Sequence, residues 1–404
     1  MHIVGGFYEE VCNYPTWHHY FGSGGRAVAA LSSLVDNITF HTYIHEDIKP
    51  SSEYFAKVHN VTLTPQPSTE KIQFQYYHAL SRPAIYSLSW PIQRQEQLHI
   101  RDANIVICYG MLEAPNPEIH ADYVIFDPQS ENNPTVLNTS HIKHLALVLN
   151  VEEGKKYTDT DSIDAVAKSF FETFPALDVL ILKDGPFGAH VFHNSQHQHI
   201  DSYITDQIFK IGSGDTFVAY FGYFWACKQM DVFEAAQKAS YATAHYCNSK
   251  VFTNDEIHIN SESFRFPAIK IHKEAFDKKI YLAGPFFTMA QRWLVEEAKH
   301  QLEKFNADVF SPLHDVGFGR ASTVTQADLQ GIDEADIVYA VLTDYDPGTV
   351  FEIGYAISKN IPVVIYIENP VAMNMTLFEG TKCTIEQDFA TSIYKTIWEL
   401  YKNK

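Results

Sequence analysis

Short runs of β-branched and aliphatic residues alternate with longer helical patterns, and this alternation limits the fold more than any other feature of the chain. The runs at residues 103–109, 123–126, 145–149, 179–182, 280–283, 337–342 and 362–367 are each followed closely by Gly, Asp, Asn or Pro, as buried strands are. Helical periodicity is found at residues 231–247, 289–305 and 390–402. This order predicts an α/β fold, with parallel sheets covered by helices on both faces.

The chain is long enough for two or three domains, since it has 404 residues and a domain has about 150. A polar stretch at 253–279, broken by Pro267, shows no sustained period, and a fresh strand, loop and helix begin after it at Ile280. We therefore expect a first domain at 1–255, a linker at 256–278 and a second domain at 279–404. Residues 36–100, rich in aromatic residues, His and Pro, are expected to add short strands or a lid to the first domain.

Composition excludes several classes of protein. Apolar residues make up 46 % of the chain, which rules out a disordered or coiled-coil protein. The formal charge is −19, so we expect neither duplex nucleic acid nor a membrane as a partner, because both are bound by clustered Lys and Arg. The five cysteines are scattered, which predicts neither a disulfide framework nor a zinc site. We find no signal peptide or membrane-spanning run, so the cytoplasm is the expected location.

The first candidate site is a glycine-rich loop before an apolar helix, Gly212-Ser213-Gly214-Asp215. Glycines at such a position let backbone N–H groups converge on an anion. An Asp among them can remove the proton from a hydroxyl that attacks phosphorus. The alternative is structural, with the two glycines making a tight turn and Asp215 only capping the helix.

This loop resembles the G-A-G-D signature of the ribokinase-like (PfkB) carbohydrate and nucleoside kinase family. Further segments match in family order over about residues 1–255: Gly22-Ser23-Gly24-Gly25-Arg26, Asp127-Pro128-Gln129, Asn150-Val151-Glu152-Glu153 and Lys183-Asp184-Gly185-Pro186-Phe187-Gly188. The resemblance implies a three-layer α/β/α domain that binds ATP and Mg²⁺, with Asp215 as the catalytic base.

The resemblance also assigns binding roles. Gly24 and Gly25 would bind the substrate, Glu153 would order Mg²⁺ through water without a direct protein ligand, and the anion hole and ATP site would comprise Gly212, Ser213, Gly214, Asn150, Glu153, Lys183, Gly185 and Gly188. Three positions depart from the family pattern and affect the expected substrate. Arg26 stands where the family usually has Asn, Glu9 and Glu10 lie where a sugar-binding Asp is expected, and Phe209-Lys210 replaces Asp-Thr.

The second candidate site lies after residue 279, in the segments Tyr281-Leu282-Ala283-Gly284-Pro285, Gln326-Ala327-Asp328 and Asp346-Pro347-Gly348-Thr349-Val350-Phe351-Glu352. We expect Tyr281, Asp346 and Glu352 beyond the carboxyl ends of strands, where parallel sheets bind ligands. The alternative is that Thr349-x-x-Glu352 and Thr325-x-x-Asp328 are capping boxes at helix starts. Several carboxylates gathered at one edge favour a functional site, because like charges raise each other's pKa.

These segments resemble the nucleoside 2-deoxyribosyltransferase family over about residues 279–380, which implies a smaller, doubly wound, flavodoxin-like domain. By that resemblance Glu352 is the nucleophile at the anomeric carbon, Tyr281 orients it, and Asp328 and Asp346 handle the leaving base. Gly284, Pro285 and Gly348 would shape the substrate site. Asn374 would complete the site of a neighbouring subunit, so we expect a homo-oligomer, and no cofactor is expected for this domain.

Together the two resemblances predict an enzyme of nucleoside or nucleotide metabolism whose ligands are small nucleosides, nucleotides or sugars. Its second domain would cleave or exchange an N-glycosidic bond, and its first domain would phosphorylate a sugar or nucleoside with ATP. The alternative is a defence or regulatory protein, in which the kinase-like domain senses a nucleotide and the second domain depletes nucleotides or NAD.

Overall fold

The computed structural model describes residues 1–129, 137, 141–253, 266–270, 278–317 and 319–402, with the backbone alone at 321 and 372–374. The chain forms two compact units, one of residues 1–205 and 209–268 and the other of residues 206–208 and 269–404. Most of the stretch expected to link two domains, at 254–265 and 271–277, lies outside the described residues.

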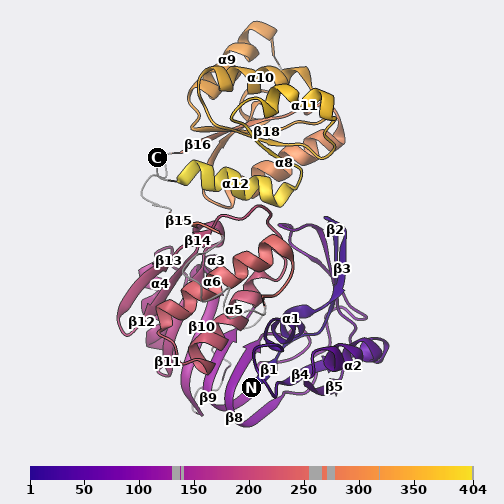
Figure 1. Cartoon of the computed structure of the whole chain (residues 1–404), viewed down its shortest axis with the longest axis vertical. Helices are drawn as coiled ribbons and strands as arrows, with labels where there is room; N and C mark the ends of the chain where they lie inside the picture. The colour runs from indigo at the N-terminus through magenta and orange to yellow at the C-terminus, as the bar shows by residue number, and fades with distance from the viewer. Residues whose placement is uncertain (130–136, 138–140, 254–265, 271–277, 318, 403–404) are drawn as a thin grey trace. The chain divides into compact units, whose positions relative to one another are not determined.

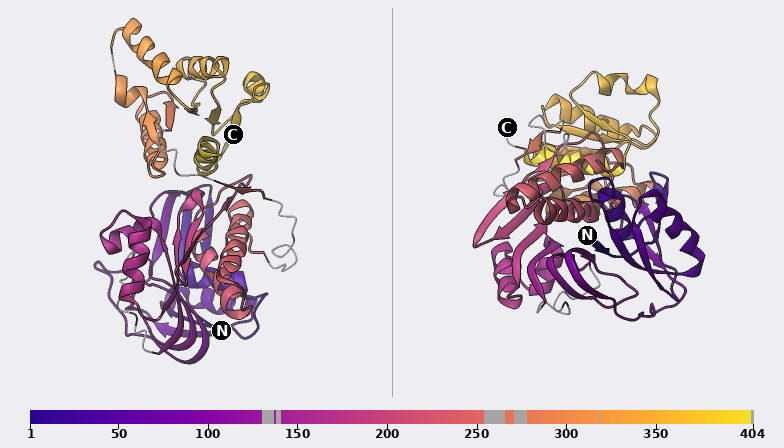
Figure 2. Two further views of the ribbon diagram at one scale, coloured as in Figure 1. Left: turned by 90° about the vertical axis from the view of Figure 1, so that its left-hand side faces the viewer. Right: turned by 60° about the horizontal axis from the view of Figure 1, so that its bottom comes forward.

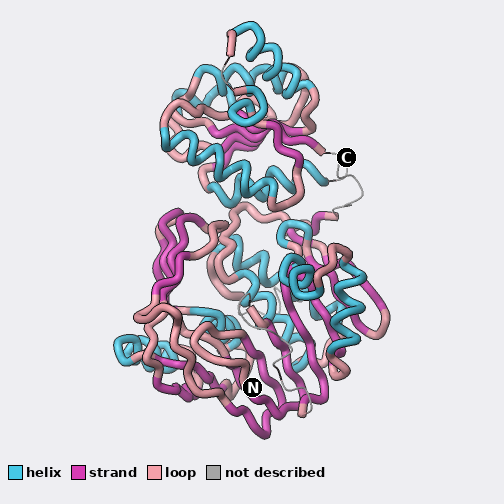
Figure 3. The backbone as a smooth tube through the Cα atoms, turned by 180° about the vertical axis from the view of Figure 1, so that it is seen from behind, coloured by secondary structure: helices cyan, strands magenta, loops and turns pink. Residues whose placement is uncertain are grey.

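The N-terminal unit is built on a nine-stranded sheet, whose strands lie side by side in Figures 1 and 3. Its order is β13-β12-β11-β10-β9-β8-β1-β4-β5; the pairs from β11 to β5 are parallel, and β12 and β13 add an antiparallel edge. The strands are β1 (His2–Val4), β4 (Thr39–Ile44), β5 (Thr62–Pro67), β8 (His99–Tyr109), β9 (Glu118–Asp127), β10 (Ile142–Asn150), β11 (Leu177–Lys183), β12 (Ala189–His193) and β13 (Gln196–Ile200).

Helices cover both faces of this sheet, as the left view of Figure 2 shows. One buried cluster joins the sheet to α1 (Gly22–Leu31), α5 (Ser213–Gly222), the π-helix η4 (Tyr223–Cys227) and α6 (Val232–Ser249). A second cluster joins the opposite face to α3 (Val151–Thr158) and α4 (Ile163–Thr173). The central strands are apolar on both faces because helices cover both, as parallel sheets require.

A smaller sheet is built from the N-terminal part of this unit. Its order is β3-β2-β6-β7, from β2 (Glu9–Tyr14), β3 (Trp17–Tyr20), β6 (Gln73–His78) and β7 (Ala84–Tyr86). The remaining elements of the unit are η1 (Glu46–Ile48), α2 (Lys49–Val58), η3 (Gly185–Phe187) and β14 (Ser202–Tyr203), the last paired with β15 (Ala268–Ile269).

The C-terminal unit is a five-stranded, fully parallel sheet of order β17-β16-β18-β19-β20. In Figure 1, α8 and α12 lie on one face of this sheet, and α9, α10 and α11 lie on the other. Its strands are β16 (Lys279–Ala283), β17 (Asp308–Phe310), β18 (Ile337–Val341), β19 (Val363–Tyr366) and β20 (Thr384–Glu386). Its helices are α8 (Met289–Glu303), η5 (Pro312–Val316), α9 (Ala321–Asp333), α10 (Pro347–Ser358), α11 (Ala372–Glu379) and α12 (Phe389–Tyr401).

The expected fold class is confirmed: both units are α/β, and the second is a smaller, doubly wound parallel sheet. All seven strands and three helices expected from the sequence are present, with ends shifted by at most a few residues. No helix in the described part of the chain is long and apolar enough to cross a membrane.

Candidate functional sites

The glycine-rich loop of the N-terminal unit leads directly into α5. Gly212 has a φ of +73° and is the N-cap of the helix, a left-handed conformation that glycine adopts without strain. A Cβ at this position would lie 1.8 Å from Arg26 Nε, so the loop also needs glycine for the close approach of that side chain. Asp215 follows in the first turn of α5, and among the described residues no side chain caps the start of this helix.

The Asp215 carboxylate is paired rather than free. Arg26 Nη1 lies 3.2 Å from its Oδ2, and Gln129 Nε2 donates to its Oδ1 over 3.3 Å. Burial raises the pKa of Asp215 to about 6, with Arg26 acting in the opposite direction and the charges of Asp127 and Glu10 adding to the rise. A carboxyl with such a pKa can accept a proton near neutral pH.

Arg26 connects this carboxylate to the smaller sheet. Its side chain is 0 % exposed and forms a two-point ion pair with Glu10 on β2, in which Nη2 lies 2.6 Å from Oε2 and Nη1 lies 3.2 Å from Oε1. Its Nε also donates to the Tyr246 hydroxyl over 3.3 Å. Arg26 and Glu10, two of the residues at which the sequence departs from the family pattern, therefore form one buried cluster with Asp215. Sequence spacing gave no signal for it, because its three members lie on β2, α1 and α5.

Two lysines lie near the start of α5. Lys183 Nζ is 2.8 Å from Asp127 Oδ2 and would be 3.2 Å from a Cβ at Gly214. Lys210 Nζ donates to Ser213 Oγ over 2.7 Å, and burial lowers its pKa. The two ammonium groups lie beside the N-terminus of a helix, where Gly214 has no side chain to fill the space. Such a site can bind phosphate oxygens.

Asn150 and Glu153 form a capping box at the start of α3. The Asn150 side chain accepts from the Glu153 N–H over 2.7 Å, and Glu153 Oε2 accepts from the Asn150 N–H over 2.8 Å. Gly24 and Gly25 lie in the first turn of α1, where Gly24 packs against the Gly5 backbone. Gly185 is the first residue of η3 and Gly188 its C-cap before β12, and both have positive φ. These residues therefore have structural tasks, and the binding roles that the resemblance implies for them stay predictions.

In the C-terminal unit, Glu352 is not a capping residue. The N-cap of α10 is Asp346, whose Oδ2 accepts from the Thr349 N–H over 2.8 Å. Thr349 is therefore the third residue of the helix and Glu352 the sixth, so the alternative of a Thr349–Glu352 capping box is wrong. The same alternative fails at Asp328, because α9 starts at Ala321 and Thr325 lies inside the helix.

The Glu352 carboxylate accepts a hydrogen bond of 2.6 Å from the Tyr281 hydroxyl. Burial raises the pKa of Glu352 to about 7, the bond from Tyr281 lowers it, and the charges of Asp328 and Asp346 raise it. Tyr281 is the third residue of β16 and 0 % exposed, so the expectation that it lies beyond the strand end is wrong; its long side chain reaches across to α10 instead.

Asp328 completes this group on α9. Its Oδ1 is buried without a hydrogen-bond partner among the described residues, and burial raises its pKa. A buried carboxyl oxygen without a partner costs free energy, which favours a role toward a ligand. Gly284 and Pro285 follow β16 directly, Gly348 lies in the first turn of α10, and the Asn374 side chain lies outside the described part of α11.

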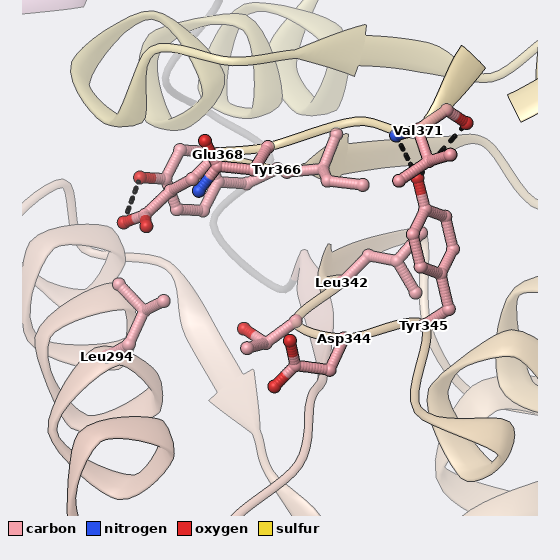
Figure 4. A pocket seen from close by; sticks show the side chains of 10 residues that line it. Leu294, Leu342, Asp344, Tyr345, Tyr366, Glu368 and Val371 are labelled. Atoms are coloured by element: carbon pink, nitrogen blue, oxygen red, sulfur yellow. Dashed lines mark hydrogen bonds between the residues drawn. The ribbon is translucent and has the colours of Figure 1, made fainter. Parts of the chain in front are cut away.

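A pocket of about 330 Å³ opens at the carboxyl ends of β18 and β19 (Figure 4). Its lining has aliphatic and aromatic walls and acidic groups, and among the described residues it includes no Lys, Arg or His: Leu294, Leu342, Thr343, Asp344, Tyr345, Tyr366, Ile367, Glu368, Asn369 and Val371. Figure 4 shows Tyr345 at one end, joined to Val371, and Tyr366 beside Glu368 at the other. Asp344 and Tyr345 were not among the site residues expected from the sequence, although both directly precede the Asp346 motif.

Comparison with known proteins identifies the C-terminal unit. Residues 280–388 match the family model described as nucleoside 2-deoxyribosyltransferase. The uncharacterized protein UU063 of Ureaplasma parvum serovar 3 (strain ATCC 700970) is 32 % identical over 109 residues, covering 22 % of this chain and 69 % of that protein. Through this domain, the chain belongs to the nucleoside 2-deoxyribosyltransferase family. The deoxyribosyltransferase-family domain thus contains Tyr281, Asp328, Asp346 and Glu352 within the matched residues.

The part of the chain outside the deoxyribosyltransferase-family domain is similar to solved kinase structures. One is ribokinase from Giardia lamblia, 11 % identical with a TM-score of 0.49, which covers 62 % of this chain and 94 % of that chain. Another is phosphofructokinase-2 from Escherichia coli in complex with substrates and products, 12 % identical with a TM-score of 0.47, which covers 63 % of this chain and 96 % of that chain.

Proposed function

We propose that the C-terminal domain cleaves or exchanges the N-glycosidic bond of a nucleoside or nucleotide, with Glu352 as the nucleophile. The hydrogen bond from Tyr281 to Glu352 carries this proposal. It occupies Oε1 and leaves Oε2 for attack, and it stabilises the ionised carboxylate against the burial that raises its pKa. Such an arrangement is needed for a carboxylate that must be charged, oriented and poorly solvated when it attacks.

The reaction proceeds in two displacements. Glu352 Oε2 forms an ester bond to the anomeric carbon through an oxocarbenium-like transition state, and the base leaves with the electrons of the C–N bond. A proton delivered to the base neutralises it, and the partly buried Asp328 carboxyl, with its raised pKa, is suited to supply that proton. Water or a second base then attacks the anomeric carbon, the Asp328 carboxylate takes up the proton that the attacking group loses, and the ester bond breaks to release Glu352 as a carboxylate.

The test is Glu352→Gln in the full chain, assayed by mass spectrometry against a panel of nucleosides, nucleotides and NAD. We expect glycosidic turnover to fall by at least about 10³-fold, since an amide cannot form the ester, with the thermal unfolding curve little changed. Glu303→Gln on the exposed side of α8 is the matched control and should keep full activity. Near-full turnover by Glu352→Gln would reject the assignment, and the panel also separates nucleoside from NAD as substrate.

We further propose that the N-terminal unit phosphorylates a hydroxyl of a sugar or nucleoside with ATP, with Asp215 as the base. The pKa of Asp215, raised to about 6, and the two lysines beside the start of α5 support this. Lys183 and Lys210 would hold phosphate oxygens, and Mg²⁺ bound with ATP would neutralise charge on the transferred group. Among the described residues, no group of three or more His, Cys, Asp or Glu could itself hold a metal ion.

A nucleotide sensor is the second candidate function of this unit. It is favoured by Arg26, whose buried pair with Glu10 also engages the Asp215 carboxylate. Asp215→Asn separates the two functions. For a kinase, the variant should bind ATP but phosphorylate about 10²–10⁴-fold more slowly than the wild type. A wild-type protein that binds ATP and phosphorylates no member of the same panel would support the sensor.

A further inference from the structure

The loop between β18 and α10 contains a turn in an unusual backbone conformation. The Asp346 N–H donates to the Thr343 carbonyl over 3.2 Å, which closes a four-residue turn. Its two central residues, Asp344 and Tyr345, each have a φ of +53°. Turns with positive φ at both central positions favour Asn-Gly or Asp-Gly. Asp tolerates this region, but for a bulky residue such as Tyr it is an outlier with a cost of about 1–3 kcal/mol.

The Tyr345 hydroxyl is in a position to hold this turn. It accepts a hydrogen bond of 2.5 Å from the Val371 N–H, and Val371 is the N-cap residue of α11. The ring also packs against the buried cluster of the C-terminal sheet. Figure 4 shows the side chain extending from the turn to Val371 at one end of the pocket.

The turn determines where α10 begins. Asp346 is its last residue, and the Asp346 carboxylate accepts from both the N–H and the hydroxyl of Thr349, over 2.8 and 3.0 Å. An N-cap fixes the first turn of a helix, and Glu352 lies in the second turn of this one. A change in the turn would therefore move the Asp346 carboxylate and the start of the helix that carries Glu352.

We propose that Tyr345 is a positioning residue for the glycosidic reaction, because its hydroxyl, fixed on the Val371 backbone, holds the left-handed turn that places Asp346 and Glu352. This inference rests on the proposed role of Glu352. Without the hydroxyl, the Tyr345 backbone would relax toward negative φ, the turn would open, and Asp346 would cap α10 for only part of the time.

The test compares two replacements of Tyr345 in the full chain. Tyr345→Phe removes the hydroxyl and keeps a bulky side chain for which a positive φ is unfavourable, so the turn should open and we expect kcat/KM to fall about tenfold. Tyr345→Gly also removes the hydroxyl, but it creates the Asp-Gly pair that this turn type favours, so we expect it to restore most of the activity. Tyr355→Phe is the control. Tyr355 lies on α10, as Glu352 does, and its hydroxyl donates a hydrogen bond to Asp333 on α9, so its removal should leave kcat/KM unchanged.

The pH dependence provides a second readout. The groups that face Glu352 are Tyr281 from β16, Asp328 from α9 and Asp346 from the turn. The charge of Asp346 raises the pKa of Glu352. If Asp346 moves away in Tyr345→Phe, the pKa of Glu352 falls and the acid limb of the rate profile shifts to lower pH. A general loss of stability would lower the rate without shifting that limb.

Amide hydrogen exchange tests the turn independently of the reaction. The Thr349 amide should exchange faster in Tyr345→Phe and return to the wild-type rate in Tyr345→Gly, whether or not the glycosidic activity has been found. An inactive wild type would thus reject the proposed function, and the exchange rates would still show whether the Tyr345 hydroxyl holds the turn. Lower activity of Tyr345→Gly than of Tyr345→Phe would overturn the proposal, because the ring itself would then be what the site needs.

Discussion

At the scale of single residues, the Tyr281–Glu352 pair shows what sequence can and cannot provide. The motifs pointed to both residues, and the structure brings them to hydrogen-bond distance. The Arg26–Glu10–Asp215 cluster was not foreseen, although all three residues drew attention, because Arg26 and Asp215 are 189 positions apart. Which charged side chains share a buried space is decided by packing, and periodicity does not report it.

Tyr281→Phe should move the pH dependence of the glycosidic reaction. Burial raises the pKa of Glu352 to about 7, and the hydrogen bond from Tyr281 opposes that rise. Without the bond the pKa increases further, so the acid limb should shift to higher pH and the rate at pH 7 should fall, with recovery above pH 8.

The measurement is a profile of kcat/KM from pH 5 to pH 9. Tyr339→Phe is the matched control, since it removes another buried tyrosine hydroxyl of this sheet, one bonded to Ser392, and should leave the limb in place. A Tyr281→Phe limb that coincides with the wild type would show that Tyr281 does not set the pKa of Glu352.

At the scale of elements, long buried parallel strands were predictable, whereas the interior strands β1 and β4 and the short edge strands were not. The strands β8, β10 and β18 read as continuous apolar runs because helices cover both faces. By contrast β3, with the sequence Trp17-His18-His19-Tyr20, and β5, which includes Pro65 and Pro67, are polar or interrupted. Only their pairing with neighbours makes them strands. β3 was therefore not expected, and β5 lies in residues 36–100, which were expected merely as short strands or a lid.

The capping box of α3 gives a prediction at this scale. Asn150→Ala should lower the free energy of unfolding by about 1 kcal/mol, because the Glu153 N–H loses its acceptor. Asn150→Ser keeps an acceptor and should recover most of that loss in chemical denaturation. If Asn150 acts only as a cap, any change in ATP affinity should parallel the change in the free energy of unfolding in both variants. A loss of ATP affinity in a stable Asn150→Ser would instead assign Asn150 to the nucleotide site.

At the scale of the whole molecule, the division into two α/β units was predictable from the break in periodicity before Ile280, whereas the homo-oligomer expected from Asn374 stays a prediction. The C-terminal unit exposes large apolar side chains at Phe287, Met289, Phe351 and Leu377, which are 69, 90, 56 and 82 % exposed. Phe351 directly precedes Glu352, and Leu377 lies on the same helix as Asn374. Large apolar groups left in water near a site favour burial against another subunit.

Mixing of inactive subunits tests a shared site. Glu352→Gln and Asn374→Ala chains, each inactive alone, should recover part of the activity when combined after mild dissociation, because some sites then pair an intact Glu352 with an intact Asn374. Activity should follow the proportions of the two chains and peak near an equal mixture. A fully active species that sediments as a monomer would exclude the shared site.

The close approach of Gly212 to Arg26 also limits the substitutions that this chain tolerates. Any side chain at 212 would occupy the place of the Arg26 guanidinium, since a Cβ would lie 1.8 Å from Nε. Arg26 in its present place therefore requires glycine at 212, and a larger residue at 212 should be harmful while the arginine is there. A genetic selection for suppressors of Gly212→Ala should therefore return smaller residues at codon 26.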